Sequence, residues 1–143
     1  MGIGQILLRL ALGAGFLLPV MDRLGVLGPP GSGPTWGDWK HFVDYTNILI
    51  PFVNRPIANF MGILVTVAEV VFGILLIVGF RIKEASVGAG ILTLCLGMCM
   101  GIFVSISAPF NYPVFVFTGR ALVLSGLNHY NWSIDNYIRK RSL

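Results

Sequence analysis

The sequence predicts an all-α integral membrane protein, an antiparallel four-helix bundle in a single domain over residues 1–143. Its 143 residues are 55% hydrophobic and only 11% charged, whereas a soluble domain usually carries about a quarter charged residues. Charges are also missing from long stretches: residues 85–119 contain none, and Glu69 is the only one in residues 56–80. Apolar runs of roughly 18 residues or more are typical of membrane-spanning helices.

Four helices are predicted to cross the membrane. The second and third carry almost no charge, the first contains Arg9, and the fourth contains Pro113 and Arg120. The connections on either side of the third helix are short, so consecutive helices should be antiparallel neighbours. The first helix has no early basic residue and no small-residue cleavage site, so we expect it to be retained. The predicted spans cover residues 2–21, 56–79, 85–107 and 113–128.

Basic residues gather at one end of the predicted bundle. The 80–84 connection contains two of them and the 129–143 tail ends in a basic cluster, whereas the 108–112 connection contains none. Because basic loops stay in the cytoplasm, we expect both termini to be cytoplasmic. The long loop over residues 22–55 then faces outward. The net charge of +4 follows from this asymmetry, and we expect no nucleic-acid partner.

The outward loop contains a Gly- and Pro-rich stretch, GPPGSGP, and then a segment that predicts a short amphipathic helix. Apolar side chains recur there at spacings of three or four residues, from Trp39 to Ile50, as on one face of a helix. Asp38 is placed to cap its first turn. Aromatic residues on such a helix suit the outer membrane interface, where they would anchor the chain or line the mouth of a cavity.

Glu69 is a lone carboxylate within the apolar stretch VTVAEVVFGILL, residues 65–76. An unpaired charge in hydrocarbon is costly, so this side chain should face the bundle and find a partner. Counted from the outer ends of their helices, Glu69 and Arg9 lie at similar depths of roughly 20 and 18 Å. We therefore predict an Arg9–Glu69 ion pair, with Arg120 nearer the outside at a depth of about 10 Å.

Two interpretations of these ionisable groups are open. In one, the ion pair fixes the register of the helices and does nothing more. In the other, it is the polar floor of a lipid-open cavity that binds the head of an amphipathic molecule. Other polar residues, Asp22 and Arg23 among them, gather at the outer end, where His41 is a candidate proton carrier. The candidate ligand-binding residues are Arg9, His41, Glu69, Asn111, Tyr112 and Arg120.

Cys95 and Cys99 lie four residues apart on the third predicted span, so they share one helical face. They do not form a CxxC motif, and no histidine accompanies them at the spacing of a metal site. A buried redox pair is one interpretation, and packing by small polarizable side chains is the simpler one. We expect no metal, no cofactor of the chain's own and no catalytic residue, and the sequence leaves enzymatic activity open.

Three segments resemble the DoxX family of small four-helix membrane proteins. They read LLRLALGAGFLLPVMDRLG in the first helix, AEVVFGILLIVGFRIKEAS in the second, and SGLNHYNWSIDNYIRKR near the C-terminus. The second segment is similar to the family's pattern of Glu, a Gly four residues later, an aliphatic run, and then Gly and Arg. The third is similar to its closing Gly, Ser-hydrophobic-Asp and basic tail. The PPGSGPTWGDW insertion and the APFNYPVFVF turn depart from the usual pattern.

The resemblance implies membrane redox chemistry. The related DoxD proteins are subunits of thiosulfate:quinone oxidoreductase, and some DoxX proteins are linked to oxidative-stress complexes. For this chain it implies a subunit or accessory of a membrane redox assembly that binds a quinone or a lipid in its bundle. Any electron carrier would be that quinone or a cofactor held by a partner. The partners would be the lipid bilayer and either other membrane proteins or further copies of the chain.

The alternative is a purely structural subunit that packs against larger membrane proteins through the 22–55 loop. It predicts a closed, dry ion pair inside the bundle and an exposed aromatic patch outside. At the other end of the chain, Ser133 is placed to cap a short terminal helix with Asp135 in its first turn. We assign that pair a structural role.

Overall fold

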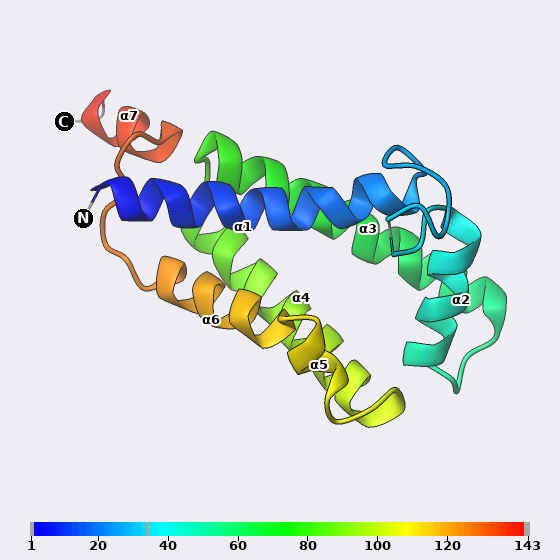
Figure 1. Cartoon of the computed structure of the whole chain (residues 1–143). Coiled ribbons are helices and arrows are strands. Elements are labelled where there is room, and N and C mark those ends of the chain that lie inside the picture. Colours follow the sequence, from blue (N-terminus) through cyan, green and yellow to red (C-terminus); the bar gives the residue numbers. More distant parts are fainter. Residues whose placement is uncertain (1, 34, 142–143) are drawn as a thin grey trace.

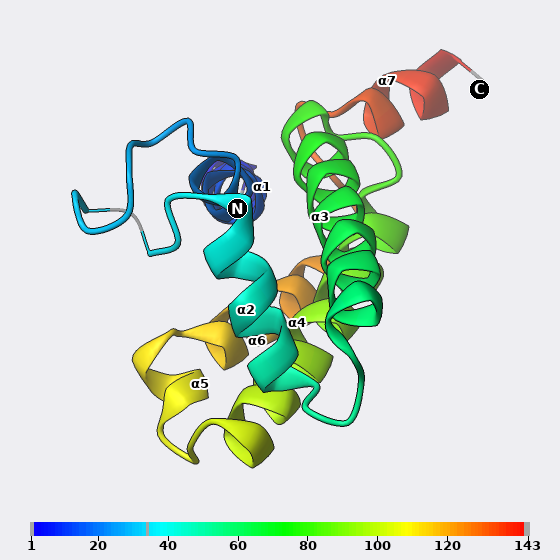
Figure 2. The ribbon, with the colours of Figure 1, turned by 90° about the vertical axis from the view of Figure 1, so that its right-hand side faces the viewer.

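The computed structural model describes residues 2–33 and 35–141, except for the side chain of Arg139. In these ranges the chain is all-helical, as predicted: α1 (Gly2–Arg23), α2 (Trp39–Leu49), α3 (Arg55–Val78), α4 (Ile82–Phe103), α5 (Ala108–Asn111), α6 (Val114–Ser125) and α7 (Ile134–Arg141). Helix α1 packs along α3, and α4 packs along α6. The two pairs lie close together near the chain termini and move apart toward α2 (Figures 1 and 2).

Three of the described helices, α1, α3 and α4, are long and apolar enough to cross a membrane. They coincide with the first three predicted spans apart from a few residues at their ends. Helix α6 has 12 residues, or about 18 Å at the helical rise, whereas the bilayer core is about 30 Å thick. The structure is thus consistent with a multi-pass membrane protein, and the four-helix membrane bundle stays a prediction.

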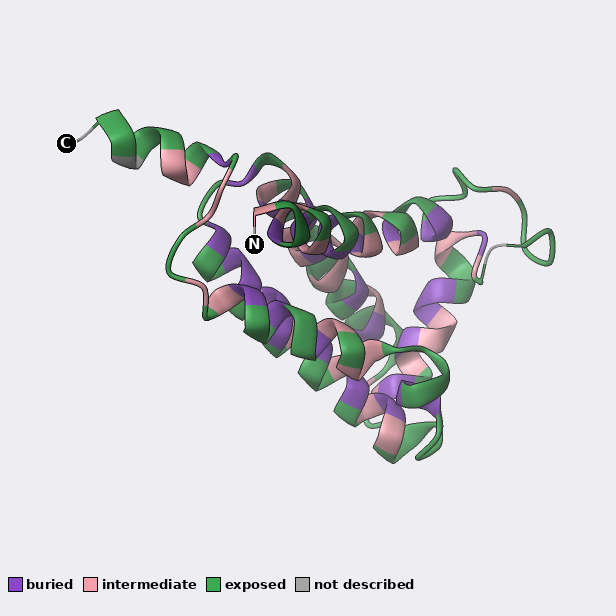
Figure 3. Cartoon of the chain, turned by 60° about the vertical axis from the view of Figure 1, so that its left-hand side comes forward, coloured by how far each residue is buried: buried purple, intermediate pink, exposed green. Residues whose placement is uncertain are grey.

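The interior of the chain lies where the two helix pairs meet. Its buried apolar residues come from four helices: Leu12, Phe16, Leu76, Ile82, Ala85, Ala89, Ala121 and Leu124. The outward faces of the same helices carry large hydrophobic side chains that the chain itself leaves uncovered, such as Ile3, Leu7, Val71, Ile74, Ile91 and Leu94 (Figure 3). Apolar side chains both inside and outside are what a bundle solvated by lipid requires.

Local sequence signals set the ends of two helices. The Asp38 carboxylate accepts a hydrogen bond from the backbone N–H of His41, which confirms the predicted cap of α2. This bond, with the contact to the His41 side chain, lowers the pKa of the exposed Asp38 carboxyl below its usual value. Asn54 caps α3 in the same way through the N–H of Ile57. Helix α3 ends at Gly79, whose φ of 79° is a left-handed conformation that favours glycine.

The connections fall at the two ends of the molecule as predicted. Both termini, the turn between α3 and α4, and α7 lie at one end, whereas the loop after α1, α2 and α5 lie at the other (Figure 1). The basic turn and the basic tail therefore share one end. Which side of a membrane that end faces stays a prediction.

Gly13 lets α1 and α3 approach backbone to backbone. A Cβ atom added at Gly13 would lie 2.9 Å from the carbonyl oxygen of Gly73 and 2.7 Å from the side chain of Ile77. The carbonyl belongs to a helix backbone and cannot move aside, so we expect Gly13→Val to separate the helices and cost about 1–3 kcal/mol of stability. Unfolding of the purified protein in mild detergent would measure the loss.

Gly4 supplies a matched control on the same helix, because a Cβ atom at Gly4 meets nothing within 4 Å. The valine variant at this position should unfold close to wild type. If the two valine variants lose equal stability, the cause is helix propensity rather than close packing between α1 and α3.

Candidate functional site

Glu69 of α3 pairs with Arg23 at the end of α1. Glu69 Oε2 lies 2.8 Å from Nη1 of Arg23, and the two side chains are only 8% and 2% exposed. The same guanidinium donates hydrogen bonds to the hydroxyl of Thr66 at 2.8 Å and to the carbonyl of Pro19 at 3.1 Å. A charge taken this far out of solvent is tolerated because it is paired and hydrogen-bonded.

Two aromatic rings from the outer loop region cover the guanidinium. Its carbon lies 3.9 Å from the ring centre of Phe42 on α2 and 5.2 Å from that of Trp36 in the preceding loop. The Trp36 and Phe42 rings also meet edge to face, with their centres 5.3 Å apart. Cation–π contact strengthens when the cation is desolvated. Arg23 therefore joins α1, α2 and α3 at one point.

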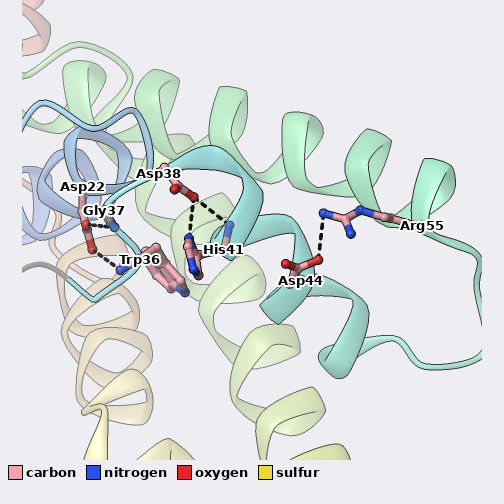
Figure 4. A network of polar contacts seen from close by, with 7 residues as sticks. All are labelled: Asp22, Trp36, Gly37, Asp38, His41, Asp44 and Arg55. Carbon is pink, nitrogen blue, oxygen red and sulfur yellow. Dashed lines mark hydrogen bonds and ion pairs between the residues drawn. The ribbon is translucent and has the colours of Figure 1, made fainter. Parts of the chain in front are cut away.

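Asp22, the neighbour of Arg23, holds the loop in this position. Its buried carboxylate accepts hydrogen bonds from the backbone N–H groups of Thr35, Trp36 and Gly37, at 3.0, 3.2 and 2.9 Å. Figure 4 shows the bonds to Trp36 and Gly37. Three bonds to one ionised acceptor fix the chain over these residues. The ring of Trp36 is thereby set against Arg23.

The predicted Arg9–Glu69 ion pair is wrong. Equal depths of Arg9 and Glu69 require the outer ends of α1 and α3 to be level. Instead, Arg23 at the end of α1 contacts Thr66, which lies 11 residues after Arg55 at the start of α3. Helix α3 thus extends past α1 by roughly 16 Å and packs there against α2. The offset brings Arg23, not Arg9, level with Glu69.

Arg9 instead binds the C-terminal segment at the opposite end of the molecule. Its guanidinium donates hydrogen bonds to the carbonyls of Trp132 at 2.9 Å and Asn131 at 3.4 Å. One turn earlier on α1, Gln5 donates to the carbonyl of His129 and accepts from the N–H of Asn131. These bonds fix the segment between α6 and α7 across the N-terminal end of α1.

The C-terminal segment also joins the turn between α3 and α4. Ser133 accepts a hydrogen bond from the N–H of Asn136, which confirms it as the cap of α7. Asp135 lies in the first turn as predicted, but its carboxylate accepts hydrogen bonds from the N–H groups of Arg81 and Ile82, 2.8 and 2.9 Å away. An acidic residue of α7 therefore caps the start of α4.

The other predicted ligand-binding residues do not converge on Glu69. The exposed His41 side chain contacts Asp38 at 2.7 Å on the surface of α2 (Figure 4). Asn111 and Tyr112 are exposed at the end of α5, and Arg120 is exposed on α6 with its guanidinium 5.9 Å from the ring of Phe117. Within the described chain, Arg23 is the one charged partner of Glu69.

Cys95 and Cys99 are free thiols on α4. Cys95 is exposed and Cys99 half-buried, so the first points out of the bundle toward the surface that lipid would cover. The described residues contain no group of three or more histidine, cysteine or acidic side chains placed to bind a metal ion.

Comparison with known proteins could show which family this chain belongs to. No protein family, characterised protein or solved structure matches the chain. The chemistry of the site must therefore be inferred from its own residues. DoxX membership stays an expectation based on the resemblance of three segments.

Arg23 is the functional candidate that sequence reasoning did not connect to Glu69. The signal available was the pair Asp22–Arg23 directly at the end of an apolar helix, ahead of a loop rich in glycine and proline. What the Arg23–Glu69 pair can do chemically depends on the hydrogen bonds that its carboxylate can still accept. Glu69 Oε2 is buried and, apart from its ion-pair contact with Arg23, has no hydrogen-bond partner in the described chain, so the carboxylate could accept a hydrogen bond from a bound molecule.

Proposed function

We propose that this chain is a small DoxX-like multi-pass protein of the bacterial inner membrane, a subunit or accessory of a membrane redox assembly. In this proposal Glu69 and Arg23 hold the polar head of a quinone or lipid while its chain lies along the bundle. The supporting observation is a nearly buried carboxylate that is paired with Arg23 and whose Oε2 has no hydrogen-bond partner in the described chain. An intramembrane ionisable residue is a functional candidate by default.

The proposal includes the four-helix membrane bundle. Helix α6 packs along α4, and α5 precedes it at the end where α2 lies. Together α5 and α6 would form the fourth crossing, with both termini in the cytoplasm. Of the residues first expected to bind the ligand, Glu69 keeps that role; Arg9, His41, Asn111, Tyr112 and Arg120 do not contact it in the described chain.

Native mass spectrometry in mild detergent tests ligand binding directly. The spectrum of wild type should show a bound quinone or lipid, and Glu69→Gln should lose it, because the amide oxygen would face the donor Arg23 and leave the NH2 group, which donates and cannot accept a hydrogen bond, toward the ligand. Thr93→Val is the matched control: it removes a buried hydroxyl that contacts Thr118 at 2.8 Å and is not a partner of Glu69. Ligand loss in both variants would indicate general loosening of the bundle and contradict the assignment to Glu69.

One observation favours a structural subunit as the second candidate. Arg23 is closed in by Glu69, Thr66, Phe42 and Trp36, as the structural alternative predicts. Two shallow hollows of about 530 and 620 Å³ open beside α2, and neither is lined by Glu69. Spectra that show associated proteins, no small ligand, and no difference between wild type and Glu69→Gln would establish this candidate.

A further inference from the structure

Helix α7 presents an apolar stripe that the described chain leaves uncovered. Ile134, Tyr137 and Ile138 lie three or four residues apart, on one face of the helix, and are 39%, 60% and 50% exposed. Just before the helix, Trp132 is 84% exposed and has a φ of 50°, a backbone conformation that non-glycine residues rarely adopt. The turn thus directs a large aromatic ring out of the molecule.

The base of α7 is nevertheless held firmly. Asp135 binds the N–H groups of Arg81 and Ile82 and donates its own N–H to the carbonyl of Gly79. These partners form the turn between α3 and α4, where two membrane-spanning helices end. From that point α7 extends sideways, away from the bundle (Figure 2). Its first turn is therefore fixed at the level where the bilayer surface should lie.

An eight-residue helix needs a surface to pack on. Isolated helices of fewer than about 12 residues are marginal in water, and the cap supplied by Ser133 stabilises only the first turn. The exposed stripe is the part of α7 that can contribute the missing packing energy. A partner therefore has to cover Tyr137 and Ile138.

The charges on and around α7 indicate what covers it. Four basic side chains in the part of the chain that the structure describes lie on or beside α7, and all four are exposed. They are Lys140 and Arg141 on α7 and Arg81 and Lys83 at the adjoining turn. The guanidinium of Arg141 lies 5.3 Å from the ring centre of Tyr137, beside the apolar stripe. Two acidic residues lie nearby. The Asp135 carboxylate accepts hydrogen bonds from backbone N–H groups, and Glu84 Oε1 lies 3.5 Å from Arg81 Nη2.

We propose that α7 and Trp132 form an interfacial anchor that binds the anionic lipid headgroups of the leaflet at the end of the molecule where the termini lie. The apolar stripe inserts at the boundary between headgroups and acyl chains, and the basic residues contact phosphates, as in other amphipathic interfacial helices. Trp132 occupies the headgroup level, where aromatic rings concentrate.

Hydrogen exchange of the full chain in lipid nanodiscs tests this anchor. One set of discs contains phosphatidylcholine alone, and the other also contains phosphatidylglycerol, which is anionic. Backbone amides of residues 137–141 should exchange more slowly in the anionic discs, by on the order of fivefold for each basic side chain that contacts the surface. Equal exchange in the two lipids would overturn the proposal.

Variants separate the charge and the apolar stripe from other causes. The double variant Lys140→Gln, Arg141→Gln should lose the part of the additional protection in anionic discs that these two side chains supply, and Ile138→Ser should lose protection in both. Lys40→Gln is the matched control, because it removes an exposed cation at the opposite end and should leave α7 unchanged. Protection of α7 that depends on protein concentration, or that persists in detergent without lipid, would indicate packing against a second copy and would overturn the proposal.

Discussion

Replacing Glu69 by leucine should destabilise the protein by about 3–5 kcal/mol, because the guanidinium of Arg23 would stay buried without its counter-charge. Arg23→Met should cost a similar amount for the opposite reason. The double variant should recover a large part of the loss, since an apolar pair of similar volume no longer carries a buried charge. Unfolding of each purified variant in the same mild detergent would measure the three free energies.

Arg120→Met provides the control for this series. It removes an exposed guanidinium from α6, and such a change costs at most about 1 kcal/mol. If Glu69→Leu is no more destabilising than Arg120→Met, the contact between Glu69 and Arg23 does not hold the fold together. If the double variant is as unstable as the sum of the two single variants, the side chains act independently rather than as a pair.

Asp22→Ala should be the second most damaging change, at about 2–4 kcal/mol, because the N–H groups of Thr35, Trp36 and Gly37 lose a shared ionised acceptor. The N–H of Gly37 is buried, and water cannot fully replace its partner. The loop should open, and Trp36 should leave Arg23. Detergent unfolding measures the stability, and faster hydrogen exchange at these three amides locates the change.

Asp44→Ala is the matched control for Asp22→Ala. Asp44 also lies in the outer region and makes an ion pair with Arg55 at 2.8 Å (Figure 4), but both side chains are about half exposed. Exposed ion pairs contribute little. An Asp22→Ala variant as stable as Asp44→Ala, with unchanged exchange at Gly37, would show that the glycine- and proline-rich loop keeps its conformation without the carboxylate.

Much of the fold follows from local sequence signals. Apolar runs predict α1, α3 and α4, the periodicity after Asp38 predicts α2, and Ser133 marks the start of α7. Each of these depends on residues within a few positions of one another along the chain. All five of these helices and both caps are present in the structure, apart from small shifts of the helix ends.

The partner of Glu69 was not predictable in the same way. Its identity depends on the offset between α1 and α3, and the part of α3 beyond α1 packs against α2, where Trp39 donates a hydrogen bond to Asn59. Nothing in the periodicity of either helix encodes that offset. The carboxylates of Asp22 and Asp135 raise the same difficulty, because they bind backbone N–H groups 13 and 53 residues away at the shortest separations, and a backbone N–H carries no sequence signature.

The contacts of Arg9 also constrain the order in which the protein is built. Arg9 is synthesised 122 and 123 residues before the two carbonyls that it binds, which belong to Asn131 and Trp132. Until those residues have been made, this arginine has no native partner, and its position near the start of α1 lets the side chain reach water. Closure of the helix bundle at this end must therefore wait until residues 131 and 132 have left the ribosome. A ribosome stalled before residue 131 would hold a chain in which Arg9 still lacks these carbonyl partners.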